Sequence, residues 1–207
     1  MQILLKDVGK RFERQWVFRR LSFDLPSGTH MAILGPNGSG KSTLLKIIAG
    51  WLNPTEGTIT YTLNGLPLDE SAELFGYLTM AAPYLELIEE FTLAEAIEFH
   101  FRFKKPMPGL TLSDITRASG LEDKSHRPIR YFSSGMKQRV KLVLALLSDT
   151  PLVLLDEPCS NLDAAAKQWY RKLIDEFTQG RTVVVGSNHS AEEYDFCTEI
   201  VLLNSSV

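Results

Sequence analysis

The nine residues "GPNGSGKST", Gly35 to Thr43, constrain the fold of this chain more than any other stretch. They follow the apolar run "HMAIL" and lead into "LLKIIAG", so a strand is expected before them and a helix after them. Gly35 and Gly40 allow the backbone to curl until several N–H groups point at one anion, and the following helix adds its positive end. The stretch therefore predicts a phosphate-binding loop between a buried strand and a helix.

The polar residues of this loop have expected roles toward a nucleotide. Lys41 is expected to reach the β and γ phosphates, Ser42 to ligate Mg²⁺, and Thr43 to touch the α phosphate. Between the two glycines, the same site is expected to be lined by Pro36, Asn37, Gly38 and Ser39. Kinases, GTPases, motors, helicases and transporters all use such a loop, so other residues must choose among them.

Two acids end the run "LVLLDE", whose continuous apolar character is typical of a strand buried on both faces. The carboxyl end of such a strand is where an open parallel sheet holds its ligand. Asp156 fits a Mg²⁺ site beside Ser42, through water, and Glu157 fits a base that polarises the water attacking the γ phosphate. The alternative, an acid that caps the next helix, is weakened because "PCSNLD" intervenes.

The element "FSSGMKQR", residues 132–139, places two serines and a glycine ahead of a long helix. Ser133 would cap that helix, which is worth about 1 kcal/mol. The same N–H groups and helix dipole would also suit a second phosphate. On these residues alone, capping is the favoured interpretation.

The order of the segments predicts an α/β fold. Strands dominate the first part, "FGYL" (residues 75–78) is expected as a further strand, and helices follow, beginning with a capping box at Thr92 and Glu95. Strands and helices then alternate, which favours a mostly parallel sheet with helices on both faces. We expect one domain: a core of residues 1–78 and 146–207 with an N-terminal antiparallel β-subdomain, and an inserted helical subdomain of about residues 79–145.

The charge, the apolar runs and the cysteine positions of the sequence limit its expected partners and location. The 22 Lys and Arg against 25 Asp and Glu leave a net charge of -3, so no electrostatic argument favours nucleic acid. No apolar stretch approaches the roughly 18 to 20 residues that cross a bilayer, and the start lacks a signal peptide, so a cytoplasmic protein is expected. Cys159 and Cys197 lack metal-ligand spacing and are expected to be free packing residues.

Five elements together resemble the ATP-binding cassette (ABC) ATPases, in particular compact bacterial export-type cassettes. They are the phosphate loop, "FSSGMKQR", "LVLLDEP", the "SNLD" loop at Ser160 to Asp163, and "SNH" ending at His189, in the family's order and at its usual spacings. The likeness spans essentially the whole chain. It implies the P-loop NTPase fold of an ABC cassette, ATP and Mg²⁺ as cofactors, and hydrolysis of ATP to ADP and phosphate.

The resemblance also implies roles for single residues. Glu157 corresponds to the catalytic base, and His189 to the switch histidine that contacts the γ phosphate and helps to orient that glutamate. Phe12, which lies 29 residues before Lys41, corresponds to the aromatic that stacks on adenine, with Trp16 as the nearest rival. The capping interpretation of Ser133 is replaced, because in this family Ser133 and Gly135 would close over ATP held by a second cassette. Asp163 would couple the two sites.

The implied function is the ATPase subunit of a membrane transporter, with a second cassette and transmembrane permease subunits as partners. Export is expected over import on the likeness to compact cassettes, and the location would be the inner face of the cell membrane. A soluble ABC ATPase, such as one for iron–sulfur assembly, and a slow-turnover nucleotide switch remain as alternatives. A P-loop GTPase or kinase would share only the first motif, and the chain has no Asn-Lys-x-Asp guanine reader.

The chain departs from the family pattern at two places. The usual Leu-Ser-Gly-Gly-Gln element carries Phe132, Ser134 and Met136 in place of its Leu, first Gly and Gln. Position 80, where the family places a glutamine that ligates Mg²⁺, carries Met, and a thioether is a poor ligand for a hard cation. We expect water to complete the Mg²⁺ shell and the contact with the membrane partner to run through groups of "AAPYLELIEEF", whose glutamates would otherwise be a solvated face.

Overall fold

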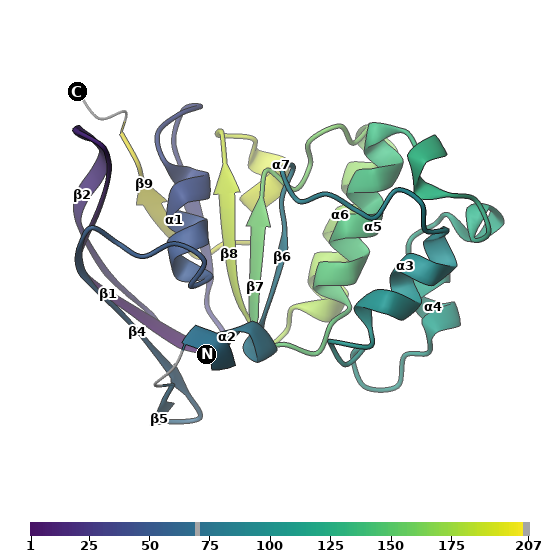
Figure 1. The fold of residues 1–207 in the computed structure, drawn as a ribbon, viewed down its shortest axis with the longest axis horizontal. Coiled ribbons are helices and arrows are strands. Elements are labelled where there is room, and N and C mark those ends of the chain that lie inside the picture. Colours follow the sequence, from purple (N-terminus) through teal and green to yellow (C-terminus); the bar gives the residue numbers. More distant parts are fainter. Residues whose placement is uncertain (69–70, 205–207) are drawn as a thin grey trace.

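A computed structural model describes residues 1–68 and 71–204, and Figure 1 shows the arrangement of their elements. The chain forms two sheets, and helices pack between them and beside them. The antiparallel sheet has the order β2-β1-β4-β5, with strands β1 (Gln2–Phe12), β2 (Gln15–Leu25), β4 (Glu56–Leu63) and β5 (Leu66–Pro67). The parallel sheet has the order β6-β7-β8-β3-β9, with strands β3 (His30–Leu34), β6 (Leu78–Ala81), β7 (Leu152–Asp156), β8 (Thr182–Ser187) and β9 (Glu199–Leu202).

Helices lie on both faces of the parallel sheet. The helices are α1 (Lys41–Ile48), α2 (Ser71–Tyr77), α3 (Leu93–His100), α4 (Leu112–Ala118), α5 (Ser134–Leu146), α6 (Ala164–Phe177) and α7 (Ala191–Tyr194), with short 3₁₀ turns η1 (Glu122–Lys124) and η2 (Ile129–Tyr131). Helix α1 lies between the two sheets, whereas α5 and α6 cover the other face of the parallel sheet (Figure 1). None of the helices among the described residues combines the length and apolar character needed to cross a bilayer.

Strand β7 separates two hydrophobic cores. Because side chains alternate along a strand, Leu152 and Leu154 enter the core formed with α1 and the antiparallel sheet. Val153 and Leu155 enter the core formed with α5 and α6. All four side chains are fully buried, so the apolar run that predicted a strand covered on both faces is confirmed.

The register of the parallel strands determines where along the sheet three functional loops begin. Leu34 of β3 pairs with Ser187 of β8, and Asp156 of β7 pairs with Gly186 of β8. The ends of β3, β7 and β8 therefore lie within one residue of the same level. The loops that follow these strands start side by side at the carboxyl edge of the sheet.

The expectation of a strand over residues 75–78 is wrong for most of its length. Phe75 and Tyr77 belong to helix α2, and strand β6 begins at Leu78 and continues to Ala81. Met80, expected just after the strand, instead lies within it and pairs with Leu154. The strand extends this far because Thr79 and Ala81, which are buried, continue the pairing with β7.

The N-terminal caps of the helices are set by local sequence. The capping box predicted at Thr92 and Glu95 is confirmed at the start of α3, and Thr111 and Asp114 form a second one at α4. Ser133 caps α5 by accepting a hydrogen bond from the N–H of Met136 at 3.2 Å, so the capping predicted from these residues alone is confirmed. Each cap satisfies N–H groups that a helix start leaves without partners.

His100 fastens the end of α3 to the end of α5 as a neutral side chain. Its Nε2 lies 2.9 Å from Ser148 Oγ, whose own hydrogen is donated to the carbonyl of Leu144 at 2.6 Å, so Nε2 carries the proton and donates. Burial above all, with the nearby charge of Lys104, lowers the pKa of His100 to about 4. An imidazole held neutral in this way takes up a proton more readily in the unfolded chain.

We predict that His100 makes the protein less stable as the pH falls from about 6.5 toward 4, because the unfolded state binds the proton first. The loss is complete near the folded pKa of about 4 and has an upper bound of about 3 kcal/mol. Urea unfolding of wild type and His100→Gln at several pH values measures it, and the variant should show a flatter pH dependence. The exposed His126 provides the control His126→Gln, and equal slopes for all three proteins would contradict the assignment.

Candidate nucleotide-binding and catalytic site

The phosphate loop connects β3 to α1 and is shaped by its glycines. Gly40 has φ 101°, and a Cβ at this position would lie 2.5 Å from Val17 Cγ1 and 3.0 Å from Phe18 Cδ1. Gly40 is also the N-cap of α1 and provides no side-chain cap. The first N–H groups of α1 are thus left open to an anion at the carboxyl edge of the sheet.

Lys41 folds back over the loop that precedes it. Its Nζ donates to the carbonyl of Gly35 at 2.9 Å and to that of Pro36 at 3.1 Å, and the side chain is buried. A cavity of about 340 Å³ opens beside it and is lined by Val17, Asn37, Gly38, Gly40, Lys41, Ser42, Thr43 and Glu157. Most of the predicted loop residues therefore meet Glu157 in one cavity, whereas Gly35, Pro36 and Ser39 do not line it.

Asp156 is a buried carboxylate with an unusual lack of donors. It is 1% exposed at the end of β7, and its carboxylate oxygens have no donor in good hydrogen-bonding geometry among the described residues, although the hydroxyls of Ser42 and Tyr84 lie close enough to interact with it. Burial is the main cause that raises the pKa of Asp156, while the Ser42 hydroxyl and the charge of Lys41 oppose the rise. Gly186 makes room for it, since a Cβ there would lie 2.9 Å from Asp156 Oδ1. Buried carboxylate oxygens without donors are groups that a cation would satisfy.

Glu157 follows in a backbone conformation that disfavours side chains. Its φ is 44°, and its N–H donates to the carbonyl of Gly186 at 2.8 Å. Asn161 and His189 also have positive φ values, of 62° and 58°. Such strain recurs at functional sites because the surrounding structure must hold it in place. Of the seven non-glycine residues with positive φ in the described part of the chain, these three lie in the loops that follow β7 and β8, and the other four lie in or beside the antiparallel sheet.

A second group of the predicted residues lies away from this cavity. Gly135 packs on the loop after β7, where a Cβ at Gly135 would lie 2.7 Å from the carbonyl oxygen of Asn161. Asp163 is exposed and caps α6 by accepting from the N–H of Ala166 at 2.8 Å. Ser133 and Gly135 do not line the cavity of the phosphate loop. The structure thus divides the predicted residues into a phosphate-loop group and a group formed by the α5 start and the "SNLD" loop.

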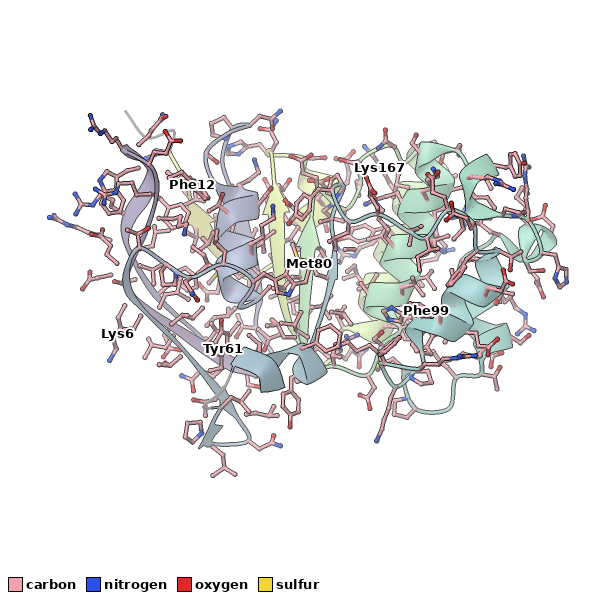
Figure 2. All side chains as sticks on the ribbon, in the orientation of Figure 1. Lys6, Phe12, Tyr61, Met80, Phe99 and Lys167 are labelled. Carbon is pink, nitrogen blue, oxygen red and sulfur yellow. The ribbon has the colours of Figure 1, made fainter. Side chains whose placement is uncertain are left out.

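The two aromatic candidates for adenine differ in what already covers them. Phe12 ends β1 and is 50% exposed, with Lys10 Nζ 5.2 Å from its ring centre. Trp16 is less exposed, and the guanidinium groups of Arg19 and Arg11 lie 4.1 and 5.2 Å from its ring. Figure 2 shows Phe12 on the antiparallel sheet, which flanks α1. Of the two rings, that of Phe12 offers the freer face.

Tyr84 is a residue of this region that the sequence motifs did not single out. Lys46 Nζ lies 4.0 Å from its ring centre, and burial together with the charge of Asp156 raises the pKa of Tyr84. Its hydroxyl is therefore close enough to Asp156 for the two groups to interact. The only sequence signal is its place as the first aromatic residue after β6.

Comparisons with known proteins identify the class. The ABC transporter family matches residues 18–160. The chain is 32% identical to the cytochrome c biogenesis ATP-binding export protein CcmA of Rhizobium etli, over 91% of this chain and 88% of the relative. It is 35% identical to the taurine import ATP-binding protein TauB of Pelagibacter ubique, over 84% of this chain and 65% of the relative. A dimeric structure of MJ0796, a bacterial ABC transporter cassette, has a TM-score of 0.80 at 26% identity and covers 98% and 94% of the two chains.

The chain therefore belongs to the ABC transporter family. It is an ATP-binding cassette that hydrolyses ATP, and the expected P-loop cassette fold, with an antiparallel sheet beside a parallel one, is confirmed.

We predict that Gly40→Ala weakens ATP binding by about tenfold or more, because its Cβ would force Val17 and the start of α1 apart. Titration calorimetry with ATP measures the change. Gly65→Ala is the matched control: Gly65 has a similar φ of 82° but open space around it, so the variant should lose about 1–2 kcal/mol of stability and keep its ATP affinity. Unchanged ATP affinity in Gly40→Ala would show that this loop does not hold the phosphates.

Proposed function

We propose that this chain is the ATPase subunit of a membrane exporter and that two cassettes bind ATP between them. The observation that carries the proposal is the cavity in which Lys41, Ser42 and Glu157 meet, together with the buried carboxylate of Asp156, which interacts with the Ser42 hydroxyl. A lysine, a hydroxyl and two acids are the groups that phosphoryl transfer needs around a nucleotide. The named exporter and importer relatives support the link to transport.

Ser42 and Asp156 are the residues that would hold Mg²⁺. The fit rests on Asp156, whose buried oxygens have no donor in good hydrogen-bonding geometry among the described residues and which lies close enough to the Ser42 hydroxyl for that group to affect its pKa. Met80 contributes no oxygen, so water would complete the shell, as would be natural for this strongly hydrated ion. When bound, Mg²⁺ neutralises charge that develops on the β and γ phosphates.

The protein's own residues supply the remaining steps. The open N–H groups of α1 and the Lys41 ammonium bind the phosphates and lower the cost of charge on the leaving group. Glu157 accepts a hydrogen bond from the attacking water, and its Oε2 also accepts a hydrogen bond from Ser160 Oγ at 3.4 Å. His189, exposed at the end of the neighbouring loop, contacts the γ phosphate. The ring of Phe12 stacks on adenine.

The second group of residues acts on the nucleotide of a partner cassette. Ser133 and Gly135 lie outside their own chain's cavity, yet the start of α5 presents N–H groups of the kind that bind phosphate. Asp163, on the "SNLD" loop against which Gly135 packs, couples the two groups. The dimeric structure of MJ0796 supports this arrangement. ATP would then hold the dimer closed, and hydrolysis would release it.

We predict that Glu157→Gln lowers kcat for ATP hydrolysis by about 100-fold or more while ATP binding is retained, because an amide cannot act as the base. Phosphate release measures the rate, and size-exclusion chromatography with and without ATP should show that the variant accumulates as a dimer. The exposed Glu176 gives the control Glu176→Gln, which should match wild type. Hydrolysis by Glu157→Gln at the wild-type rate would remove Glu157 from the mechanism.

An apolar groove beside this site is the proposed contact with the membrane subunit. Its volume is about 410 Å³, and Met80 of β6 and Phe99 of α3, both labelled in Figure 2, line it together with Phe75 and Phe103. Phe75 and Phe103 are 56% and 63% exposed, so apolar surface is left open to solvent. Glu86 and Lys104 also line the groove, so charges of both signs accompany its apolar surface, and a short helical segment with an apolar face suits it.

The groove is lined in part by β6, the strand that pairs with β7, and β7 ends in Asp156. Met80 pairs with Leu154 of β7, two residues before Asp156. A segment seated against Met80 would therefore push on the strand that positions Asp156 and Glu157. This proximity supports coupling between the membrane partner and ATP hydrolysis.

We favour export because the CcmA export protein, a compact cassette, is matched along 88% of its own length. A cassette that works with an integral membrane subunit would sit at the inner face of the cell membrane. The soluble iron–sulfur type of ABC ATPase and a slow nucleotide switch gain no support from the named relatives, which are export and import proteins.

We predict that Phe103→Glu abolishes recovery of a membrane protein with this chain when it is purified from its native membrane in mild detergent, because a carboxylate would enter the apolar groove. ATP hydrolysis by the isolated variant should stay close to wild type. Leu66→Glu, at a 70% exposed position on β5, is the matched control and should keep the membrane partner. Recovery of only soluble proteins with wild type would contradict the transporter function, and undiminished recovery with Phe103→Glu would remove the groove as the contact.

A further inference from the structure

Glu193 is a buried acid that the catalytic roles above do not use. It lies on α7, four residues after His189, and is 4% exposed. Its Oε1 accepts from the N–H of Cys159 at 3.1 Å, and its Oε2 accepts from Ser187 Oγ at 2.5 Å. The two donors belong to different loops, so one carboxylate joins them.

The first loop is the one that carries Glu157. Cys159 is two residues beyond Glu157, and its backbone N–H is the atom bound to Glu193. The carbonyl of the intervening Pro158 accepts from Gln138 Nε2 at 2.9 Å, and Gln138, on α5, is 3% exposed. The backbone just after Glu157 is therefore held from two sides, by the helix that begins at the "FSSGM" turn and by Glu193.

The second loop is the one that carries His189. Ser187 Oγ donates to Glu193 and accepts from the N–H of Ser190 at 3.2 Å, so the hydroxyl closes a ring around His189. The φ of His189 is 58°, and that of Glu157 is 44°. Both strained residues thus sit between anchors that lead to the same carboxylate.

The chemistry of the contacts explains why an acid occupies this position. A carboxylate is an acceptor at both oxygens, and the two groups that face it are an N–H and an O–H donor. Burial raises the pKa of Glu193, and the hydrogen bonds from Ser187 and Cys159 oppose this rise. Lys167, the nearby cation, pairs instead with the exposed Glu192 at 3.2 Å. Glu193 is therefore held by directed hydrogen bonds.

We propose that Glu193 is a positioning residue that locks the Glu157 loop and the His189 loop into one unit, and that Gln138 extends this unit to α5. The inference rests on the proposed roles of Glu157 and His189. When a partner's nucleotide engages the start of α5, the connection through Gln138, Pro158, Cys159 and Glu193 sets the base and the switch histidine together. Glu193 itself touches no reacting atom.

Three variants test the proposal through kcat and KM for ATP. Glu193→Ala should lower kcat on the order of 100-fold with KM changed less than about twofold, because reacting groups shift while the phosphate loop is intact. Glu193→Gln should restore kcat to within about threefold of wild type, because an amide can keep both contacts. The Oε1 atom still accepts from the N–H of Cys159, and the amide nitrogen donates to Ser187 Oγ. The Ser187 hydroxyl can then donate its own hydrogen to the carbonyl of Ser190 at 3.4 Å. Glu192→Ala, on the same helix but exposed, is the control and should match wild type.

A double variant separates positioning from general support. Because residues that act as a unit are not additive, Glu193→Ala combined with His189→Ala should be no slower than the slower single variant. Should Glu193→Ala fail to fold, Ser187→Ala removes only one of the two contacts and should lower kcat about tenfold with KM unchanged.

The outcomes that overturn the proposal are distinct from those that overturn the function. Wild-type kcat in Glu193→Ala, or in Ser187→Ala if the former does not fold, contradicts the positioning role. A fall in kcat that Glu193→Gln does not rescue, or that multiplies with His189→Ala, also contradicts it. Wild-type hydrolysis in Glu157→Gln would instead overturn the proposed catalytic function, whatever Glu193 does.

Discussion

Parallel pairing among β3, β7 and β8 is the constraint on which the rest of this structure depends. The pairs Leu34 with Ser187 and Asp156 with Gly186 align the three strand ends almost level. The phosphate loop, the acids and the histidine loop must then emerge next to one another, although the phosphate loop lies more than a hundred residues before the other two in the sequence. A shift of one residue in this register would turn every side chain of a strand to the opposite face and would move Asp156 out of place.

The same alignment requires energetically unfavourable features at the carboxyl edge of the sheet. Asp156 is buried without a donor in good hydrogen-bonding geometry among the described residues, and Glu157 and His189 adopt left-handed backbone conformations. Conformations of this kind persist only where the surroundings enforce them. Here the enforcement comes from the fully buried strands beneath and from directed hydrogen bonds, such as those that Glu193 accepts from Cys159 and Ser187.

Sequence patterns predicted those parts of the fold and site that local chemistry determines. The glycine spacing around Lys41 predicted the loop between β3 and α1, and the capping box at Thr92 predicted the start of α3. The run "LVLLDE" predicted a buried strand ending in acids, and the general rule for parallel sheets predicted where those acids would gather. These inferences needed only neighbours in sequence or the geometry common to all parallel sheets.

Features that depend on specific distant contacts were missed or misplaced. Met80 was expected after a strand and lies within one, because pairing with Leu154 decides where β6 ends. Glu193 reads as one acid among several on a short helix until its contact with Cys159, 34 residues away, is seen. The resemblance favoured Phe12 over Trp16, but the sequence could not show that the guanidinium groups of Arg19 and Arg11 lie against the Trp16 ring.

The alternation of side chains along β7 has a wider consequence. Leu152 and Leu154 pack into one core, and Val153 and Leu155 pack into the other. The two faces of one strand therefore contribute to both cores. Neither core can melt without exposing half of the strand that ends in Asp156. The nucleotide pocket therefore has no independent foldable half, and truncation on either side of the sheet would dismantle the pocket together with the core that was removed.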